Sequence, residues 1–366
     1  MNIGVVEEKF FDIEEVLELE CGKGLKGVRV SYETYGELNE NKDNAILILH
    51  ALTGDHHVAG YHTEHDRKPG WWNNMVGPGL AFDTNKNFVI CSNILGGCRG
   101  TTGPCSINLE TNREYGLDFP MVTISDMVKL QKKLMDHLGV KKITVTGGSM
   151  GGMQALEWAI EYPDMVKGAI VIASTSRLSA QAIAFNAVGR HAIISDENFN
   201  NGNYYGGPYP EKGLSIARMV GHITYLSEEA MHNKFGRDFK GDPSFDFGVD
   251  FEVESYLDYQ GRIFVDRFDA NSYLYITKAV DYFDLVKKHG TLIDAFKKTN
   301  SKFLIICFST DWLFTPRQSK EMVEALVRAG KEVSFVEIES TLGHDAFLIE
   351  VENQTKIIRS FLGEGD

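Results

Sequence analysis

Short apolar runs alternate with amphipathic stretches along much of the chain, and this alternation predicts the fold class. Residues 45–49 (AILIL) form a continuous apolar run, which is typical of a strand covered on both faces. Residues 125–139 have apolar side chains at roughly helical spacing and end in Gly139, which suits the C-terminal end of a helix. Further strands are expected at 87–93, 143–145, 168–175, 302–310 and 333–340, and further helices at 153–161 and 317–330.

Regular alternation of strand and helix predicts a mainly parallel sheet with right-handed crossovers, that is, an α/β fold. Between residues 177 and 297 the alternation stops and the pattern becomes mostly helical, with polar loops such as 198–210 and 236–248. This segment is too long for a connection within a compact domain. We therefore expect an α/β core formed by 1–176 and 298–366, with 177–297 inserted as a helical lid.

The composition is that of an ordinary globular protein, and it argues against several classes of function. The 366 residues carry a formal net charge of −14, which repels phosphate backbones and disfavours a nucleic-acid partner. No apolar stretch approaches the roughly 20 residues that cross a bilayer, and the first residues do not resemble a signal peptide. The five cysteines, an odd number, favour reduced thiols in a cytoplasmic protein.

The spacing of cysteines and histidines predicts neither a metal site nor another bound cofactor. Cys98 and Cys105 are too far apart for a Cys-x-x-Cys knuckle, and no HExxH or HxxEH pattern occurs. The histidines at 50, 56, 57, 62 and 65 form a cluster in the sequence that could suggest a metal, but residues 50–57 (HALTGDHH) lack the helical spacing that directs two ligands at one ion. We therefore expect no metal.

The densest chemical signal is the string 147–151 (GGSMG), which matches the G-x-S-x-G pattern of a nucleophile elbow. The small neighbours allow a tight, strained turn that holds Ser149 at the edge of the sheet. The pattern alone is weak, but a predicted strand precedes it and a predicted helix follows it, as the α/β-hydrolase fold requires. The alternative is a glycine-rich turn without chemistry.

A serine hydroxyl needs a base, and in this fold an acid and then a histidine follow the serine along the chain. Asp311 comes directly after a late strand, and His344 lies in the loop after the last one. We therefore expect Ser149, Asp311 and His344 to form a catalytic triad. His50 and the histidines of the insertion are rivals for the base, and Asp345 is a rival for the acid.

A tetrahedral intermediate at the serine also needs an oxyanion hole made of two backbone N–H groups. One is expected from Met150, the residue after the nucleophile. The other is expected from the loop 50–54, at Leu52. The side chains at these positions matter little, because the backbone donates the hydrogen bonds.

Five longer strings are far more specific than the nucleophile motif: 50–60 (HALTGDHHVAG), 88–104 (FVICSNILGGCRGTTGP), 147–159 (GGSMGGMQALEWA), 217–227 (ARMVGHITYLS) and 343–348 (GHDAFL). Through them the chain resembles, over essentially its whole length, the homoserine O-acetyltransferases of methionine biosynthesis. The resemblance implies transfer of acetyl from acetyl-CoA, a co-substrate, to the hydroxyl of L-homoserine through an acetyl-serine intermediate. It also implies a homodimer paired through the helices of the insertion.

The resemblance further implies residues for the acceptor. Homoserine is a zwitterion, so its site needs one anchor of each charge. By the family's pattern, Arg218 clamps the carboxylate and Asp345 binds the ammonium group. Tyr225 and Thr53 are further candidates for the same pocket. A salt bridge on the surface of the insertion remains the alternative role for Arg218.

Other functions stay open at the level of sequence. The same machinery serves an esterase or thioesterase if water replaces the amino-acid acceptor. Some relatives of this family use succinyl-CoA as donor or serine as acceptor, and a succinyl group would need an additional cationic or donor group near Ser149. A binding protein that kept the fold without catalysis is disfavoured by the intact order of the triad.

Overall fold

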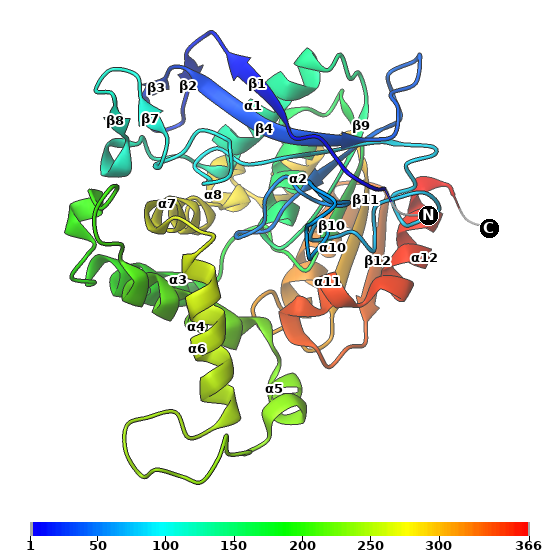
Figure 1. Ribbon diagram of the computed structural model, residues 1–366. Coiled ribbons are helices and arrows are strands. Elements are labelled where there is room, and N and C mark those ends of the chain that lie inside the picture. The colour runs from blue at the N-terminus through cyan, green and yellow to red at the C-terminus, as the bar shows by residue number, and fades with distance from the viewer. Residues whose placement is uncertain (1–2, 365–366) are drawn as a thin grey trace.

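The computed structural model describes residues 3–364 and is built around one eight-stranded sheet (Figure 1). Strand β1 pairs antiparallel with β4, and β4 pairs antiparallel with β6. All the later neighbours pair parallel, so the sheet is mainly parallel as predicted. In order across the sheet the strands are β1 (Lys9–Ile13), β4 (Val28–Tyr35), β6 (Phe88–Ser92), β5 (Ala45–Leu49), β9 (Ile143–Gly148), β10 (Val166–Ile172), β11 (Lys302–Phe308) and β12 (Val333–Ile338).

Helices cover both faces of this sheet. The helices of the core are α1 (Ile124–His137), α2 (Met150–Glu161), α10 (Pro316–Arg328), α11 (Ala346–Ile349) and α12 (Val351–Leu362). Leu47, Val145 and Ile305 point to one face and share a hydrophobic cluster with residues of α1, α2 and α10. Ile48 and Ile306 point to the other face and share a second cluster with residues of α12. Side chains that alternate along each strand thus fill two layers, one on each side.

Local sequence explains where the first core helix begins and ends. Thr123 and Asp126 form a capping box before α1, which satisfies backbone N–H groups at the start of the helix. Gly139, at φ +70°, follows the end of α1 in a left-handed conformation that glycine adopts easily. Helix α2 begins at Met150, three residues before the predicted start, so the helix follows Ser149 directly.

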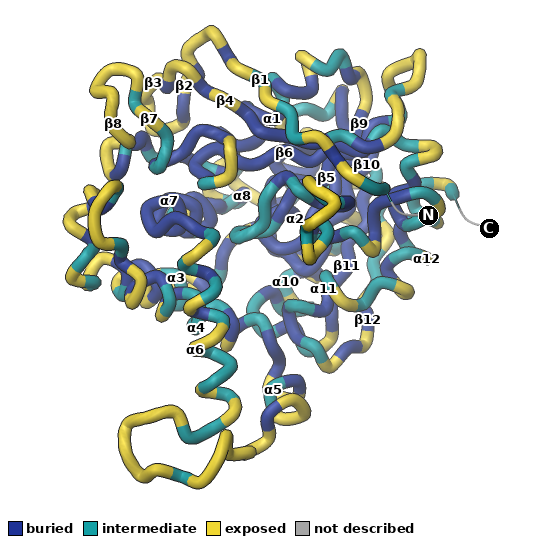
Figure 2. The backbone as a smooth tube through the Cα atoms, in the orientation of Figure 1, coloured by how far each residue is buried: buried dark blue, intermediate teal, exposed yellow. Residues whose placement is uncertain are grey.

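A helical insertion separates β10 from β11, and α4 packs against both α3 and α6 within it. Its longer helices lie to one side of the sheet, and the loop between α5 and α6 projects away and is largely exposed (Figures 1 and 2). The helices are α3 (Ala180–Ile194), η2 (Asn200–Gly202), α4 (Glu211–Tyr225), α5 (Glu228–Phe235), α6 (Glu252–Val265), α7 (Ala270–Asp281), α8 (Leu285–His289) and α9 (Leu292–Lys297).

The remaining elements are short. They are β2 (Leu17–Glu18), β3 (Gly24–Leu25), β7 (Ile107–Asn108), β8 (Arg113–Glu114), η1 (Gly116–Asp118) and η3 (Gly343–Asp345). Of all the helices in the described part of the chain, none is both long enough and apolar enough to span a membrane.

Candidate active site

Ser149 occupies the sharp turn between β9 and α2. Its backbone has φ +58° and ψ −124°, a conformation that residues with a side chain rarely adopt. Neighbouring contacts hold the turn, because the Ser149 N–H donates to the Ile172 carbonyl at 3.0 Å and the Ser174 hydroxyl donates to the Ser149 carbonyl at 2.7 Å. A Cβ atom at Gly151 would lie only 2.0 Å from the Leu49 carbonyl oxygen, so only glycine fits there.

His344 and Asp311 meet although they come from different connections of the sheet. His344 lies in η3 after β12, and Asp311 lies just beyond β11. The Nδ1 atom of His344 is 2.7 Å from Oδ2 of Asp311. The other carboxylate oxygen of Asp311 accepts the backbone N–H groups of Leu313 and Phe314, at 3.0 and 2.9 Å. These bonds fix the carboxylate, so the histidine is oriented by a group that is itself held in place.

The surroundings of His344 tune its basicity. Burial lowers the pKa of His344, but the charge and the hydrogen bond of Asp311 and the charge of Asp345 outweigh it, so the pKa lies above its usual value. The proton shared with Asp311 belongs on Nδ1, which leaves Nε2 free to accept a proton. Phe347 packs against His344 with ring centroids 5.4 Å apart, and its ring also lies against Gly148 beside the serine.

A mostly apolar cavity opens at Ser149. Leu52 and Met150, whose N–H groups are the predicted oxyanion donors, line this cavity together with the serine. Tyr225 of α4 also lines it, and burial raises the pKa of this tyrosine, so its hydroxyl stays protonated. None of the described residues that line the cavity carries a charged side chain. The cavity therefore suits an uncharged acyl group.

Arg218 and Thr53, predicted for the acceptor, are in direct contact. The Arg218 guanidinium donates to the Thr53 hydroxyl at 3.2 Å, and both residues line a second cavity that also includes Ala51 and Gly54 of the predicted oxyanion loop (residues 50–54). Asp345, the predicted ammonium anchor, follows His344 and is partly buried. Burial raises the pKa of Asp345, while the positive charges of His344 and Arg218 oppose this.

Sequence reasoning missed a second arginine in the same cavity. Arg267 precedes α7, donates to the Thr53 carbonyl at 3.2 Å and is partly buried. Arg218 and Arg267 both lie over the ring of Phe264, at 4.7 and 5.4 Å from its centroid. Burial and the neighbouring Arg218 lower the pKa of Arg267. Within the part of the chain that the structure describes, neither guanidinium forms a salt bridge with a carboxylate.

Asp55 lines the same cavity and its charge acts on Arg267, as that of Asp345 acts on Arg218, but neither carboxylate forms a salt bridge with these guanidiniums. Two neighbouring guanidiniums without a direct ion pair favour binding of an anion that comes from outside the protein. No spacing signal in the sequence predicts that Arg267 joins Arg218 at this cavity. Arg267 is held there by its contact with Thr53, which lies 214 positions away in the sequence. The segment that carries Arg267 lies outside the five strings quoted for the resemblance. Only the folded insertion brings both arginines to the oxyanion loop.

Comparisons with known proteins agree on one family. A family model described as the alpha/beta hydrolase fold matches residues 44–351. The homoserine O-acetyltransferase of Methanohalobium evestigatum is 56% identical over 364 residues, which cover 99% of this chain and 74% of the relative. The homoserine O-succinyltransferase of Acidithiobacillus ferrooxidans is 53% identical over 367 residues, which cover 99% of this chain and 96% of the relative.

Solved structures give the same architecture. The crystal structure of a homoserine O-acetyltransferase from Bacillus anthracis superimposes with a TM-score of 0.93 at 32% identity, covering 98% of each chain. The crystal structure of esterase E22 superimposes with a TM-score of 0.91 at 33% identity, and the match covers 98% of this chain and 100% of the esterase chain. The fold is therefore shared by acyltransferases and by an ester hydrolase.

Proposed function

The chain belongs to the homoserine O-acetyltransferase family within the α/β-hydrolase fold, and we propose that it transfers acetyl from acetyl-CoA to the hydroxyl of L-homoserine. The observation that carries the proposal is the fixed pair His344 and Asp311 together with a strained Ser149, whose neighbour Gly148 lies against the ring of Phe347 that packs on His344. Products are O-acetyl-L-homoserine and CoA. As a biosynthetic acyltransferase that depends on acetyl-CoA, the protein is proposed to act in the cytoplasm, in methionine biosynthesis.

In the first half-reaction Ser149 attacks the thioester carbonyl while Nε2 of His344 takes the hydroxyl proton. The carbonyl oxygen becomes an oxyanion, and the backbone N–H groups of Leu52 and Met150 are proposed to stabilise it. When the tetrahedral intermediate collapses, the carbon–sulfur bond breaks and the CoA sulfur takes the proton from His344. Acetyl-Ser149 and free CoA remain.

In the second half-reaction the homoserine hydroxyl loses its proton to Nε2 of His344 and attacks the acetyl ester. The ester bond to Ser149 breaks, and the serine oxygen takes the proton back. The same base and the same oxyanion donors therefore serve both steps. Homoserine needs to approach the ester from the side that CoA has vacated.

The acceptor is proposed to bind by its two charges. Arg218 and Arg267 would hold the carboxylate between them, which supplies the direct ion pair that neither guanidinium forms among the described residues. Asp345 would accept the ammonium group, and its position next to His344 brings the acceptor close to the base. Tyr225 and Thr53 complete this proposed pocket.

Acetyl is the donor that the cavity at Ser149 supports best. A succinyl group would bring a free carboxylate into a cavity whose described lining has no charged side chain, and burying an unpaired ion is costly. The 53% identical succinyltransferase makes the comparison of donors essential. We expect kcat/KM for acetyl-CoA to exceed that for succinyl-CoA by at least about tenfold, and that for homoserine to exceed that for serine.

An ester hydrolase is the second candidate, favoured by the likeness to esterase E22. The chemistry is the same until water or homoserine attacks the acyl-enzyme. The insertion, which carries Arg218 and Arg267 to the oxyanion loop, is proposed to act as a lid that admits the amino acid and limits water. We place its limits at residues 177 and 297, between two parts of the core at 1–176 and 298–366.

One assay separates these candidates. Release of the CoA thiol from acetyl-CoA is followed with and without L-homoserine, in the wild type and in Ser149→Ala, with Ser195→Ala as an exposed serine control. Release that depends on homoserine and falls at least about 1,000-fold only in Ser149→Ala supports the transferase. Release at the same rate without homoserine would instead identify a hydrolase.

The protein is further proposed to form a homodimer through the insertion, as the family resemblance implies. Apolar side chains on the outside of two helices support this: Ile183, Val188 and Ile194 on α3, and Ile216 and Ile223 on α4, are all exposed. Exposed apolar groups gathered on one pair of packed helices are typical of a subunit interface.

A further inference from the structure

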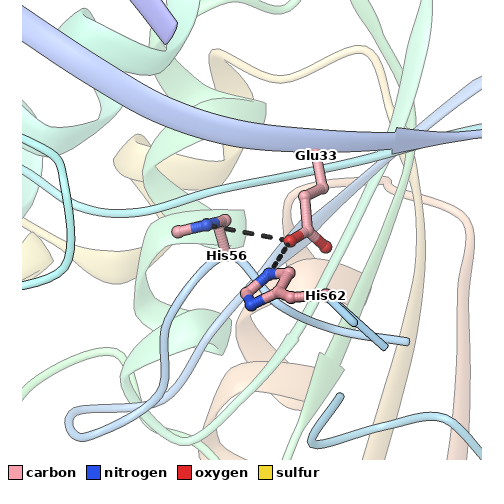
Figure 3. A group of neighbouring side chains, drawn as sticks. All are labelled: Glu33, His56 and His62. Carbon is pink, nitrogen blue, oxygen red and sulfur yellow. Dashed lines mark hydrogen bonds and ion pairs between the residues drawn. The ribbon is translucent and has the colours of Figure 1, made fainter. Parts of the chain in front are cut away.

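Glu33 is a fully buried carboxylate on β4, and two histidines from the segment after β5 point at one of its oxygens (Figure 3). Nε2 of His62 lies 2.6 Å and Nε2 of His56 lies 3.8 Å from Oε1 of Glu33. The three atoms all lie within 4.8 Å of one another. One carboxylate oxygen and two imidazole nitrogens therefore converge on one point, and none of the three residues belongs to the proposed triad.

This donor set has the chemistry of a metal site. Imidazole nitrogen and carboxylate oxygen are the ligands that zinc and related divalent ions take in proteins. Bonds of about 2.0–2.2 Å in tetrahedral geometry place ligand atoms roughly 3.4 Å apart. The separations of 2.6 and 3.8 Å lie on either side of that value, so small side-chain rotations would accommodate an ion.

Further groups hold the carboxylate in position. The Tyr35 hydroxyl donates to Oε2 of Glu33, and Nδ1 of His57 lies 3.1 Å from both oxygens. Such outer partners orient a metal ligand and are part of most metal sites. They leave Oε1 as the oxygen that faces His56 and His62.

The site is also accessible. The side chain of His62 is 42% exposed, although Glu33 behind it is not exposed at all. Glu8, whose side chain is 37% exposed, lies 3.1 Å from the same nitrogen of His56 and is the nearest further carboxylate. An ion can therefore enter from solvent at the His62 side without disruption of the core.

We propose that Glu33, His56 and His62 bind one divalent transition-metal ion, with zinc the best match, at residues other than those of the proposed triad. The ion would join β4 to the segment that continues from the oxyanion loop, so its role is structural. The histidine cluster at 50–65 contains two of these ligands, but its spacing did not predict a site because the third ligand, Glu33, comes from β4.

The full-length protein, stripped of metal with a chelator, is titrated with Co²⁺ and followed by its visible d–d absorption, and with Zn²⁺ by calorimetry. His62→Gln removes one ligand from a side chain that is partly exposed, so the fold should survive. His65→Gln is the matched control, because this exposed histidine lies three positions further on and outside the group. Circular dichroism verifies that both variants fold.

The wild type and His65→Gln are expected to bind one equivalent of metal with equal affinity. His62→Gln is expected to bind at least about tenfold more weakly, because loss of a ligand costs no less than loss of an outer partner. Absence of one-to-one binding in the wild type, or equal binding in His62→Gln, would overturn the proposal. Glu33 would then be only the centre of a hydrogen-bonded cluster, and the proposed acyl transfer would be unaffected.

Discussion

Nδ1 of His344 lies 2.7 Å from Oδ2 of Asp311, and the two residues are only 3% and 2% exposed. Adjacent parallel strands, β11 and β12, carry them to the same edge of the sheet. The contact between a buried imidazole and a buried carboxylate determines which nitrogen bears the proton. The role of His344 as the proposed base therefore depends on its contact with Asp311, which keeps Nε2 free to accept a proton.

Replacing Asp311 by asparagine should lower kcat by about 10,000-fold while leaving the fold intact. The amide can offer an N–H group to Nδ1, which favours the tautomer whose Nε2 already carries a proton and cannot act as a base. Release of CoA thiol measures the effect. Asp258→Asn, at an exposed position on α6, is the control. Near-normal activity of Asp311→Asn would remove Asp311 from the triad.

The acid side of the pH profile should report His344. Because the pKa of His344 is raised in the folded protein, the base becomes protonated and inactive as pH falls through a midpoint above the pKa of an ordinary histidine. Asp345→Asn removes one of the charges that raise this pKa, so its midpoint should lie at lower pH. The acylation rate with acetyl-CoA alone is the measurement, since Asp345 is also proposed to bind homoserine. An unchanged midpoint in the variant would contradict the assignment.

Arg267→Lys should raise KM for homoserine about tenfold, a loss of about 1.4 kcal/mol in binding. Lysine keeps the charge but loses the planar fork that matches a carboxylate. The rate of enzyme acylation by acetyl-CoA should stay within about twofold of wild type. Arg262→Lys, at an exposed position near the end of α6, is the matched control. A slower acylation step with unchanged KM would show instead that Arg267 positions the oxyanion loop.

Val188→Asp should convert the proposed dimer into a monomer. Val188 is 53% exposed on α3, and a carboxylate there would be buried without a partner in an interface. Light scattering after size-exclusion chromatography should give the chain mass of 40.9 kDa for the variant and twice that mass for the wild type. Val327→Asp on α10, 60% exposed and on a helix of the core rather than on α3 or α4, should remain a dimer. A monomeric wild type would contradict the proposal directly.

The parallel sheet could be predicted from local sequence. The placement of Ser149 and Asp311 after predicted strands could be predicted for the same reason. A strand covered on both faces must be apolar throughout, as β5 is, and the residues after such strands gather at one edge. Strand β4 was not predicted, because polar residues such as Arg29 and Glu33 interrupt its apolar pattern. Glu33 is nevertheless buried, since Tyr35 and histidines from a distant segment hydrogen-bond to its carboxylate.

Arg267, the second arginine of the proposed acceptor cavity, was not predicted for a related reason. Its contact with Thr53 joins the insertion to the core across 214 positions, and no periodic pattern records such a contact. The sequence thus predicts groups that a single strand end or turn presents. It does not predict contacts between residues of the insertion and residues of the core, such as that of Arg267 with Thr53, because these form only when the two parts pack together.

The left-handed backbone of Ser149 also bears on how stable this protein can become. At φ +58° and ψ −124° a side chain is strained by roughly 1–3 kcal/mol, whereas glycine adopts such angles readily. Ser149→Gly should therefore melt at a higher temperature than Ser149→Ala, which keeps the strain, and equal melting temperatures would argue against it. Selection for activity then keeps the free energy of unfolding lower than this fold permits. A variant that no longer needs the reaction would become more stable by replacing Ser149 with glycine.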